Sequence, residues 1–416
     1  MNKPYKTLEK IHYSDTSSQR FSTNKELAQC RLTSESSFRT GIMLETGELF
    51  FIVPNELSIM NEQVLRAERK VSSLWKNIPP IAQAEQIRNL ILGEIIETNE
   101  MEGIRSTKKQ VKNAIEKAER KSENAKPELY VEFALLYLEL LNPQSQNPER
   151  PEDIRKIYNA VVEGTIDKKN YPDGALFRAS GVEIISKSAK IIHEGVNPEE
   201  KIFFMLKEML SLVNSSAYPQ LYSAILSHFL FEYIHPFYDG NGRTGRYLLS
   251  KYLGAVLSLP TVLSLSKTIA ENKERYYKAF EATENPLNHA EATHFIMVIM
   301  GLIKNAQEKL IDSLSKKQKQ LEVAQEALRS VEKNYHLSFV ESQIIYSAIQ
   351  SYLFGMKQGI EMSEIVTHVE KSKQTVRKYA KELENKYLIE IEKRKPLSFV
   401  LSQTAKRVLN LEEEGY

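Results

Sequence analysis

Cysteine is almost absent from this chain of 416 residues, in which Cys30 is the only one. A single cysteine excludes a disulfide within the chain and a zinc site built on cysteines. Apolar side chains make up 42% of the residues, enough to build a core without such staples. A lone thiol is typical of proteins from a reducing compartment.

Long apolar runs are missing as well. No stretch approaches the roughly 18 apolar residues that a membrane span requires. The N-terminal residues MNKPYKTLEKIHYSDTSSQR are polar and contain no apolar centre of a signal peptide. We therefore expect a cytoplasmic protein that does not interact with a membrane.

The chain has no excess of charge of one sign. Its 56 basic and 54 acidic residues give a formal charge of +2. There is thus no global field that would attract nucleic acid, and any such contact must come from a local basic patch. The length predicts two or three domains, and we find no repeat of solenoid period.

Helical periodicity dominates what is present. Apolar residues recur three and four positions apart in residues 56–121, 200–213 and 219–234, whereas residues 1–40 are polar and weakly patterned. The segment GIMLETGELFFIV (41–53) predicts a hairpin at its Thr-Gly pair, and VEIISKSAKIIHEG (182–195) predicts a second one. We expect a mostly α fold with small β-hairpins.

Changes in pattern divide the chain into four predicted regions. The region 306–335 is highly charged and predicts a long, solvent-exposed helix that serves as a spacer or as the seam of a homodimer. The regions are 1–130 (N-terminal), 131–305 (core), 306–335 (connecting helix) and 336–416 (C-terminal module).

The segment HPFYDGNGRTGR (235–246) carries the strongest functional signal. It follows the apolar stretch QLYSAILSHFLFEYI and precedes a second apolar helix. Gly240 and Gly242 allow consecutive backbone N–H groups to point into one concavity that binds anions. The N-terminus of the following helix favours negative charge. Arg243 and Arg246, one helical turn apart, add two guanidinium groups.

Two further side chains complete the chemistry of this segment. Asp239 supplies the carboxylate that a Mg²⁺ ion needs when phosphate and water provide its other ligands. His235 has the ordinary pKa suited to accepting a proton near neutral pH. The set indicates phosphoryl or nucleotidyl transfer, and the missing Lys-Ser/Thr pair excludes a Walker A loop.

The segment resembles the Fic family signature HPFxxGNGRxxR at every fixed position. The resemblance implies a helical Fic core that transfers AMP from ATP to a Ser, Thr or Tyr hydroxyl of a target protein. It implies that His235 is the base, that Asp239 holds Mg²⁺ (or Mn²⁺) at the α- and β-phosphates, and that Arg243 and Arg246 bind the outer phosphates. Gly240, Asn241 and Gly242 would line the phosphate loop, and pyrophosphate would leave.

The resemblance extends loosely over residues 50–305. The segment GALFRASGVEII (174–185) is similar to the start of the family's flap hairpin, which implies that Val182, Ile184 and Ile185 hold the target. ENKERYYKAF (271–280) resembles the helix beside the adenine, which implies roles for Asn272, Tyr276 and Tyr277. The two tyrosines are equally well interpreted as core aromatics. His228 is interpreted as packing within its apolar helix.

TNEMEG (98–103) resembles the inhibitory pattern [S/T]xxxE[G/N] of Fic proteins, here on the N-terminal side of the core. Thr98 and Glu102 share a helix face, and Gly103 is a usual helix stop. A carboxylate at the end of a helix is electrostatically unfavourable without a cationic partner, and the resemblance implies that the partner is Arg246. A solvated Glu102 is the alternative.

Residues 361–409 predict a helix, a short turn, a second helix and two strands, and resemble a winged helix-turn-helix. The recognition helix would span 373–385 and the wing tip would carry a basic triplet. DNA contacts would come from Gln374, Thr375, Arg377, Lys378, Lys393, Arg394 and Lys395. Winged helices also dock proteins, so both kinds of partner stay open.

The expected function is therefore an AMP transferase that Glu102 inhibits. One alternative is a nucleotide-sensing, DNA-binding regulator with a non-catalytic Fic core. Others are removal of AMP, with Glu102 orienting the attacking water, and transfer of a different phosphate-containing group.

Overall fold

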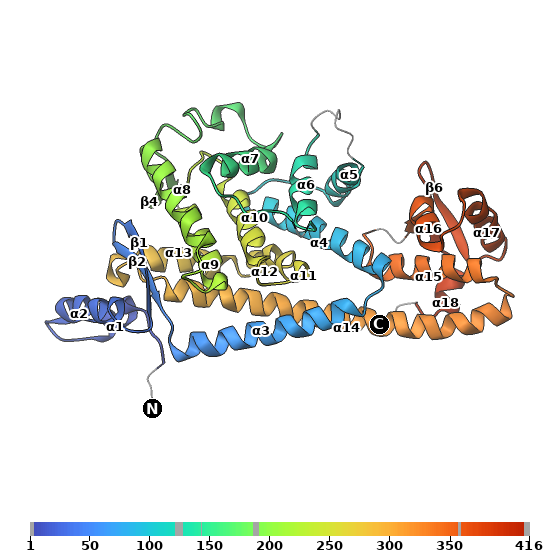
Figure 1. Ribbon diagram of the computed structural model, residues 1–416, viewed down its shortest axis with the longest axis horizontal. Coiled ribbons are helices and arrows are strands. Elements are labelled where there is room, and N and C mark those ends of the chain that lie inside the picture. Colours follow the sequence, from blue (N-terminus) through green and yellow to red (C-terminus); the bar gives the residue numbers. More distant parts are fainter. Residues whose placement is uncertain (1–3, 121–127, 143, 186–190, 357–358, 412–416) are drawn as a thin grey trace. The chain divides into compact units, whose positions relative to one another are not determined.

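The computed structural model describes residues 4–120, 128–142, 144–185, 191–356 and 359–411. They are mostly helical and include three small antiparallel sheets, which confirms the predicted mostly α class (Figure 1). The chain forms two compact units. Unit 1 comprises Met1–Arg69 and Leu92–Glu308, and unit 2 comprises Lys70–Ile91 and Lys309–Tyr416. Each unit thus joins two separate stretches of sequence, and the four consecutive regions stay a prediction.

Unit 1 begins with two short helices and a hairpin. Helices α1 (Leu8–Ser14) and α2 (Arg20–Leu32) occupy the weakly patterned N-terminal residues, where the sequence indicated no element. Strands β1 (Ser37–Leu44) and β2 (Gly47–Ile52) pair antiparallel. Gly47, at the turn, has a φ of 140°, a value that L side chains rarely adopt. The hairpin predicted at the Thr-Gly pair is confirmed.

Helices form most of the rest of unit 1. The predicted helical stretches and the flap hairpin are all present, with the hairpin turn at 186–190 outside the described residues. The helices are α5 (Lys108–Glu119), α6 (Val131–Glu139), α7 (Pro151–Val162), α8 (Glu199–Asn214), α9 (Gln220–Ile234), α10 (Asn241–Leu253), α11 (Leu259–Val262), α12 (Leu265–Glu271) and α13 (Lys273–Glu284); the flap strands are β3 (Glu183–Ile185) and β4 (Ile191–Glu194).

Helix α9 lies at the centre of the unit 1 core. Nearly all of its side chains are buried, as its all-round apolar pattern predicts. It packs against α8 and α10 (Figure 1). His228 is buried, and its two ring nitrogens lie 3.1 Å from the Gly245 carbonyl and 2.7 Å from the Tyr276 hydroxyl. Its interpretation as a packing residue is confirmed.

Three long helices have residues in both units: α3 (Asn55–Lys76), α4 (Pro80–Met101) and α14 (Thr293–Asn334). Helix α14 is continuous through residue 305, where the sequence suggested a boundary. It is also not exposed all round, because apolar residues recur every three or four positions along it. Those buried within 310–331 are Leu310, Ile311, Leu314, Leu321, Ala324, Leu328 and Val331. The expectation of a solvent-exposed helix is wrong for this face.

The C-terminal part of unit 2 has the predicted order of helix, turn, helix and two strands. Its sheet has the strand order β5-β7-β6. Helix α17 has the bounds that the sequence predicts, and its buried residues Val376, Ala380 and Leu383 form one face. The elements are α15 (Phe339–Phe354), β5 (Gly359–Glu361), α16 (Met362–Val369), α17 (Lys373–Asn385), β6 (Ile389–Arg394), β7 (Leu397–Leu401) and α18 (Gln403–Val408).

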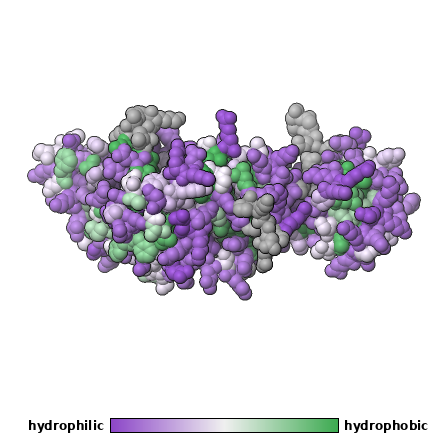
Figure 2. Space-filling view, turned by 90° about the horizontal axis from the view of Figure 1, so that it is seen from above, coloured by the Kyte–Doolittle hydropathy of each residue, from purple (hydrophilic) through white to green (hydrophobic). Residues whose placement is uncertain are grey.

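No helix among the described residues is both long enough and apolar enough to span a membrane. On the face drawn in Figure 2, hydrophilic residues predominate and hydrophobic ones form small separate groups.

Candidate active site

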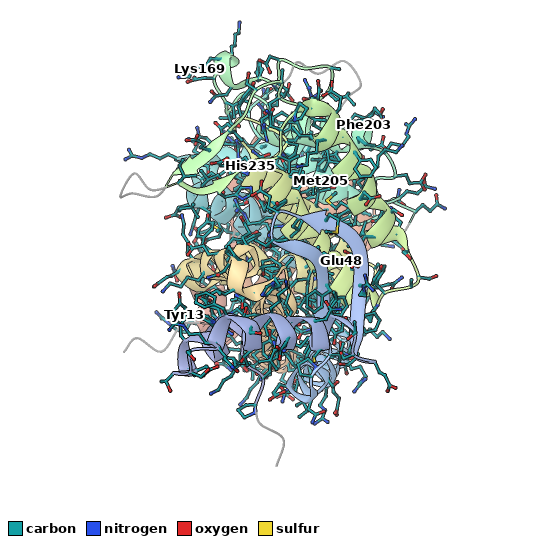
Figure 3. The ribbon with its side chains drawn as sticks, turned by 90° about the vertical axis from the view of Figure 1, so that its left-hand side faces the viewer. Tyr13, Glu48, Lys169, Phe203, Met205 and His235 are labelled. Atoms are coloured by element: carbon teal, nitrogen blue, oxygen red, sulfur yellow. The ribbon has the colours of Figure 1, made fainter. Side chains whose placement is uncertain are left out.

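A cavity of about 560 Å³ opens in unit 1 beside the segment 235–246. Its wall is formed by the end of α9, the loop into α10, the end of α4, the flap and α13. The lining residues are Glu102, Val182, Glu183, Ile184, Ile192, His193, Glu232, His235, Tyr238, Asp239, Gly240, Asn241, Gly242, Arg246, Tyr276, Tyr277, Phe280, Glu281 and Glu284. Figure 3 shows His235 well separated from Tyr13 of α1, and no residue of that helix lines the cavity.

The loop between α9 and α10 is fixed by its own side chains. His235 ends α9 in the left-handed conformation, with a φ of 49°, and Gly240 precedes α10 with a φ of 83°. Asn241 folds back over the loop, because its amide accepts from the Phe237 N–H at 3.0 Å and donates to the Phe237 carbonyl at 2.7 Å. Asn241 therefore holds the loop shape as well as lining the cavity.

The N-terminus of α10 faces the cavity. Its first residues, Asn241 and Gly242, line the wall. The first N–H groups of a helix have no partner inside the helix and attract anions. The carboxylate of Glu102 lies so close to Gly242 that a Cβ at this position would overlap it unless the Glu102 side chain shifted. The anion at this helix end is therefore the carboxylate of Glu102, from the same chain.

Arg246 and Glu102 form an ion pair at this position, which is the pairing that the family resemblance implies, and Glu102 is therefore not merely solvated. The Arg246 Nη2 donates to Glu102 Oε1 at 2.8 Å and to the Thr98 carbonyl at 3.0 Å, and its Nε donates to the Thr98 hydroxyl at 2.7 Å. Arg246 is 2% exposed. Three acceptors from the end of α4 thus hold one buried guanidinium.

The electrostatics of Glu102 follow from this contact. Burial acts to raise its pKa, but the charge of Arg246 and the hydrogen bond from it more than offset that effect, and the pKa lies below its ordinary value. Gly103, with a φ of 72°, follows α4, and the Ile104 N–H donates to the Asn99 carbonyl. This helix end fixes where Glu102 emerges.

Arg243 points elsewhere. Its Nη1 donates to the Thr165 hydroxyl at 2.7 Å, the residue is fully buried, and it does not line the cavity. Its Nε and Nη2 atoms are buried without a hydrogen-bond partner. The structure therefore brings Arg246 to the cavity, whereas the guanidinium of Arg243 is buried outside its wall and keeps two donors without a hydrogen-bond acceptor.

His235 lies in the cavity as a neutral imidazole. Burial lowers its pKa to about 4, and the nearby charge of His193 contributes. Its Nδ1 lies 3.3 Å from the Glu232 carbonyl, which can only accept a hydrogen bond. This contact places the proton on Nδ1 and leaves the Nε2 lone pair unprotonated.

Asp239 lines the same cavity. Its Oδ2 accepts a long hydrogen bond of 3.4 Å from the Asn170 amide, and the side chain is half-buried. Among the described residues, no cluster of three or more His, Cys, Asp or Glu could hold a metal ion. A single carboxylate beside an anion site fits Mg²⁺ that takes its other ligands from phosphate and water.

The flap and α13 supply the apolar part of the wall. Val182, Ile184, Tyr276 and Tyr277 line the cavity as expected. Asn272 does not line it, since its amide donates to the Thr268 carbonyl at 2.9 Å. The side chain of Ile185 lies outside the described residues. Tyr276 is buried and bonded to His228, so it is both a core aromatic and a wall residue.

Sequence reasoning missed three polar residues at the site. Arg178 is fully buried and donates to main-chain carbonyls of Ser180, Val196, Ile234 and His235. Glu232 is the only acidic residue in its apolar stretch, a signal that could have been noticed. Burial raises its pKa to about 8, and its Oε1 atom has no partner. The third, His193, gave no signal, because its partners are distant in sequence.

In unit 2, the residues expected to contact DNA lie at the surface. Lys393 and Arg394 end β6, and Lys395 follows in the turn. All seven are solvent-accessible, with Thr375 the most covered: Gln374, Thr375, Arg377 and Lys378 on α17, and Lys393, Arg394 and Lys395 at the β6–β7 turn. Lys378 lies 3.9 Å from Glu382 on the same helix.

Residues 148–253, which include the loop 235–246, match the sequence model of the Fic/DOC family. Among solved structures, the chain is similar to a Fic family protein from Desulfovibrio desulfuricans (TM-score 0.47, 16% identity, 82% of this chain and 96% of that one). It is also similar to a Fic domain containing signaling protein from Bacteroides thetaiotaomicron, with a TM-score of 0.44 and 16% identity over 62% of this chain and 97% of that one. A third similar structure is Fic-1 from C. elegans, with a TM-score of 0.45 and 14% identity over 74% of this chain and 81% of that one.

Proposed function

We propose that this chain is a protein adenylyltransferase, which transfers AMP from ATP to a Ser, Thr or Tyr hydroxyl of a target protein. One observation carries the proposal: His235, Asp239, Arg246 and the N-terminal end of α10 all line one cavity. A proton acceptor, a metal carboxylate and an anion site in one place are the groups that nucleotidyl transfer requires.

In the proposed reaction, the Nε2 lone pair of His235 accepts the proton of the target hydroxyl. The hydroxyl oxygen bonds to the α-phosphorus, the bond to the oxygen that bridges to the β-phosphorus breaks, and pyrophosphate leaves. The negative charge of a bound triphosphate would raise the pKa of His235 from its low value and strengthen it as a base. Asp239 would hold Mg²⁺ or Mn²⁺, which would neutralise phosphate charge.

We further propose that Glu102 inhibits this reaction. Its carboxylate lies at the N-terminus of α10 and pairs with Arg246. This helix end and this guanidinium are the two features of the site best suited to binding an outer phosphate. A triphosphate that keeps its α-phosphate before His235 must displace this carboxylate or bind beside it. Displacement would cost the ion pair with Arg246, and binding beside the carboxylate would bring like charges together. ATP would then bind in a pose that does not react.

Labelled ATP tests the proposal. The chain and its Glu102→Gly variant are incubated with a cell lysate and with ATP labelled at the α- or the γ-phosphate. Protein bands that carry the α-label alone support AMP transfer, and bands that carry the γ-label indicate phosphoryl transfer. The double variant Glu102→Gly/His235→Ala is the matched control and should give far weaker α-labelled bands than Glu102→Gly. Labelled GTP and UTP test transfer of another nucleotide.

Two outcomes would favour the alternative functions. Release of AMP from a labelled target by the wild-type chain, lost in Glu102→Gly, would favour AMP removal with Glu102 orienting water. ATP binding without any labelled protein, in every variant, would favour a nucleotide-sensing regulator.

A second candidate function is DNA binding by unit 2. The supporting observation is the exposure of the basic residues on α17 together with the basic turn between β6 and β7. Such side chains neutralise phosphates and release counterions. Measuring DNA affinity at increasing salt tests this function, and no binding at low salt would favour a protein-docking role for unit 2.

A further inference from the structure

His193 joins the flap to two other elements of the site. It lies on β4, opposite Ile184 of β3. Its Nδ1 lies 2.6 Å from the Glu284 carboxylate at the end of α13, and its Nε2 lies 2.7 Å from the Tyr233 carbonyl in the last turn of α9. One imidazole therefore fastens the strand to both helices.

The partners of His193 define its protonation. A main-chain carbonyl only accepts hydrogen bonds, so Nε2 must carry a proton. An ionised carboxylate also only accepts, so Nδ1 must carry a proton as well. With Glu284 ionised, His193 is thus an imidazolium. Burial acts to lower the pKa of His193, but Glu284 more than offsets this and raises it above the ordinary value.

The cation lies next to the proposed base. The ring centres of His193 and His235 are 6.5 Å apart. His193 is faced by Glu284 from α13 and by Glu232 from α9. His235 is faced by His193 from β4, Arg178 from the segment before β3, and Glu102 from the end of α4. A positive charge at this distance opposes protonation of His235.

We propose that His193 is a positioning residue: paired with Glu284 as an imidazolium, it holds β4 against α9 and α13 and adds to the effect of burial that disfavours protonation of His235. The inference rests on the proposed function for its consequence, because only a base needs a free lone pair. A bound triphosphate favours protonation of His235, and the His193 cation counters this while the flap stays in place.

Nuclear magnetic resonance of the full chain, with histidine rings labelled at the ε1 carbon, tests the proposal without an activity assay. The chain has 8 histidines, and substitution of single histidines assigns their signals. We expect His193 to titrate above the ordinary histidine pKa and His235 below it. His193→Gln should raise the pKa of His235 by about half a unit to two units, as Coulomb's law gives for this separation.

Two substitutions on α13 form a matched pair. Glu284→Gln removes the carboxylate that faces His193 and should lower the pKa of His193. Glu281→Gln removes the same charge one turn earlier and should leave the His193 titration much less changed. His193 titrating at or below the ordinary pKa, equal effects of the two substitutions, or an unshifted His235 in His193→Gln would each overturn the proposal. If one variant does not fold, the wild-type titration and the other variants still decide.

Activity then separates this inference from the proposed function. If AMP transfer occurs, its loss at acidic pH should begin at a higher pH in His193→Gln than in wild type, because His235 becomes easier to protonate. A purely structural role would lower the rate equally at all pH values and overturn the proposal. If the histidine titrations are as expected but no AMP transfer occurs, the proposed function is refuted, whereas the positioning role of His193 paired with Glu284 is supported.

Discussion

Removal of the Glu102 carboxylate should activate AMP transfer. Glu102→Gly frees Arg246 and removes a negative charge from the N-terminus of α10. The substitution lies just after the last residue of α4, so it does not place a glycine inside that helix. Thr98 still accepts two hydrogen bonds from Arg246, which should keep the guanidinium in place.

The geometry of the ion pair gives the size of the effect. The Arg246 Nη2 and Glu102 Oε1 atoms are 2.8 Å apart, and the two side chains are 2% and 25% exposed. Two unit charges about 4 Å apart at an effective dielectric of about 20 interact by about 4 kcal/mol. A phosphate regains part of this interaction when it replaces the carboxylate. Since each ~1.4 kcal/mol is about tenfold in rate, we expect a gain of about ten- to a thousandfold.

The assay is incorporation of α-labelled AMP into the chain itself and into lysate proteins. Glu100→Gly is the control, because Glu100 is an exposed carboxylate on the same helix, and its loss should not activate. Arg246→Ala should not reproduce the gain, since it removes a phosphate ligand together with its partner. A correctly folded Glu102→Gly variant with unchanged labelling would refute the reasoning.

Acidification should not mimic the substitution at moderately low pH. The pKa of Glu102 lies below its ordinary value because the influence of Arg246 exceeds that of burial. A depressed carboxyl pKa means that the ion pair is fully formed above the ordinary pKa and is lost only as the pH falls through the lowered value. Inhibition that disappears between pH 7 and the ordinary glutamate pKa of about 4.3 would contradict this ion-pair account.

Further predictions concern other parts of the chain. His235→Ala should lower AMP transfer by about a hundred- to ten-thousandfold while ATP affinity, measured by calorimetry, changes little; undiminished labelling would exclude His235 as the base. Asp239→Ala should weaken Mg²⁺-dependent activity, and equal activity with EDTA present would exclude a metal role. Arg178→Ala should lower the free energy of unfolding by about 3 kcal/mol or more, since the hydrogen bonds of this buried guanidinium to four main-chain carbonyls are lost; an unchanged denaturation midpoint would contradict this. If unit 2 binds DNA, changing residues 393–395 to alanine should reduce the slope of log affinity against log salt concentration by the equivalent of about three phosphate contacts. An unchanged slope would mean that other residues contact the phosphates.

The helices and hairpins could be predicted from the sequence because their signals are local. The all-round apolar pattern of α9 predicted a buried helix, and the Thr-Gly pair predicted the turn between β1 and β2. Where the pattern was weak, as in α1 and α2, no element was predicted. The buried face of α14 was missed because abundant charge masked its apolar spacing.

The chemistry of the loop 235–246 could also be predicted from the sequence. Its residues are contiguous, so their spacing alone brings a base, a carboxylate and an anion site together. The sequence did not predict that the guanidinium groups of Arg243 and Arg246 point to different places. Both lie on α10, but one is held by Thr165 of a distant loop and the other by the end of α4.

The sequence by itself thus determined the mostly α class and the chemistry of one loop, because backbone preferences and short spacings act between neighbouring residues. Only the tertiary structure decided between a solvated Glu102 and one paired with Arg246, 144 positions away, and only the tertiary structure revealed that His193 meets Glu284. Those contacts depend on how whole helices pack, and a charge acquires a partner, a shifted pKa and a role only when packing brings another group within a few ångströms and excludes water.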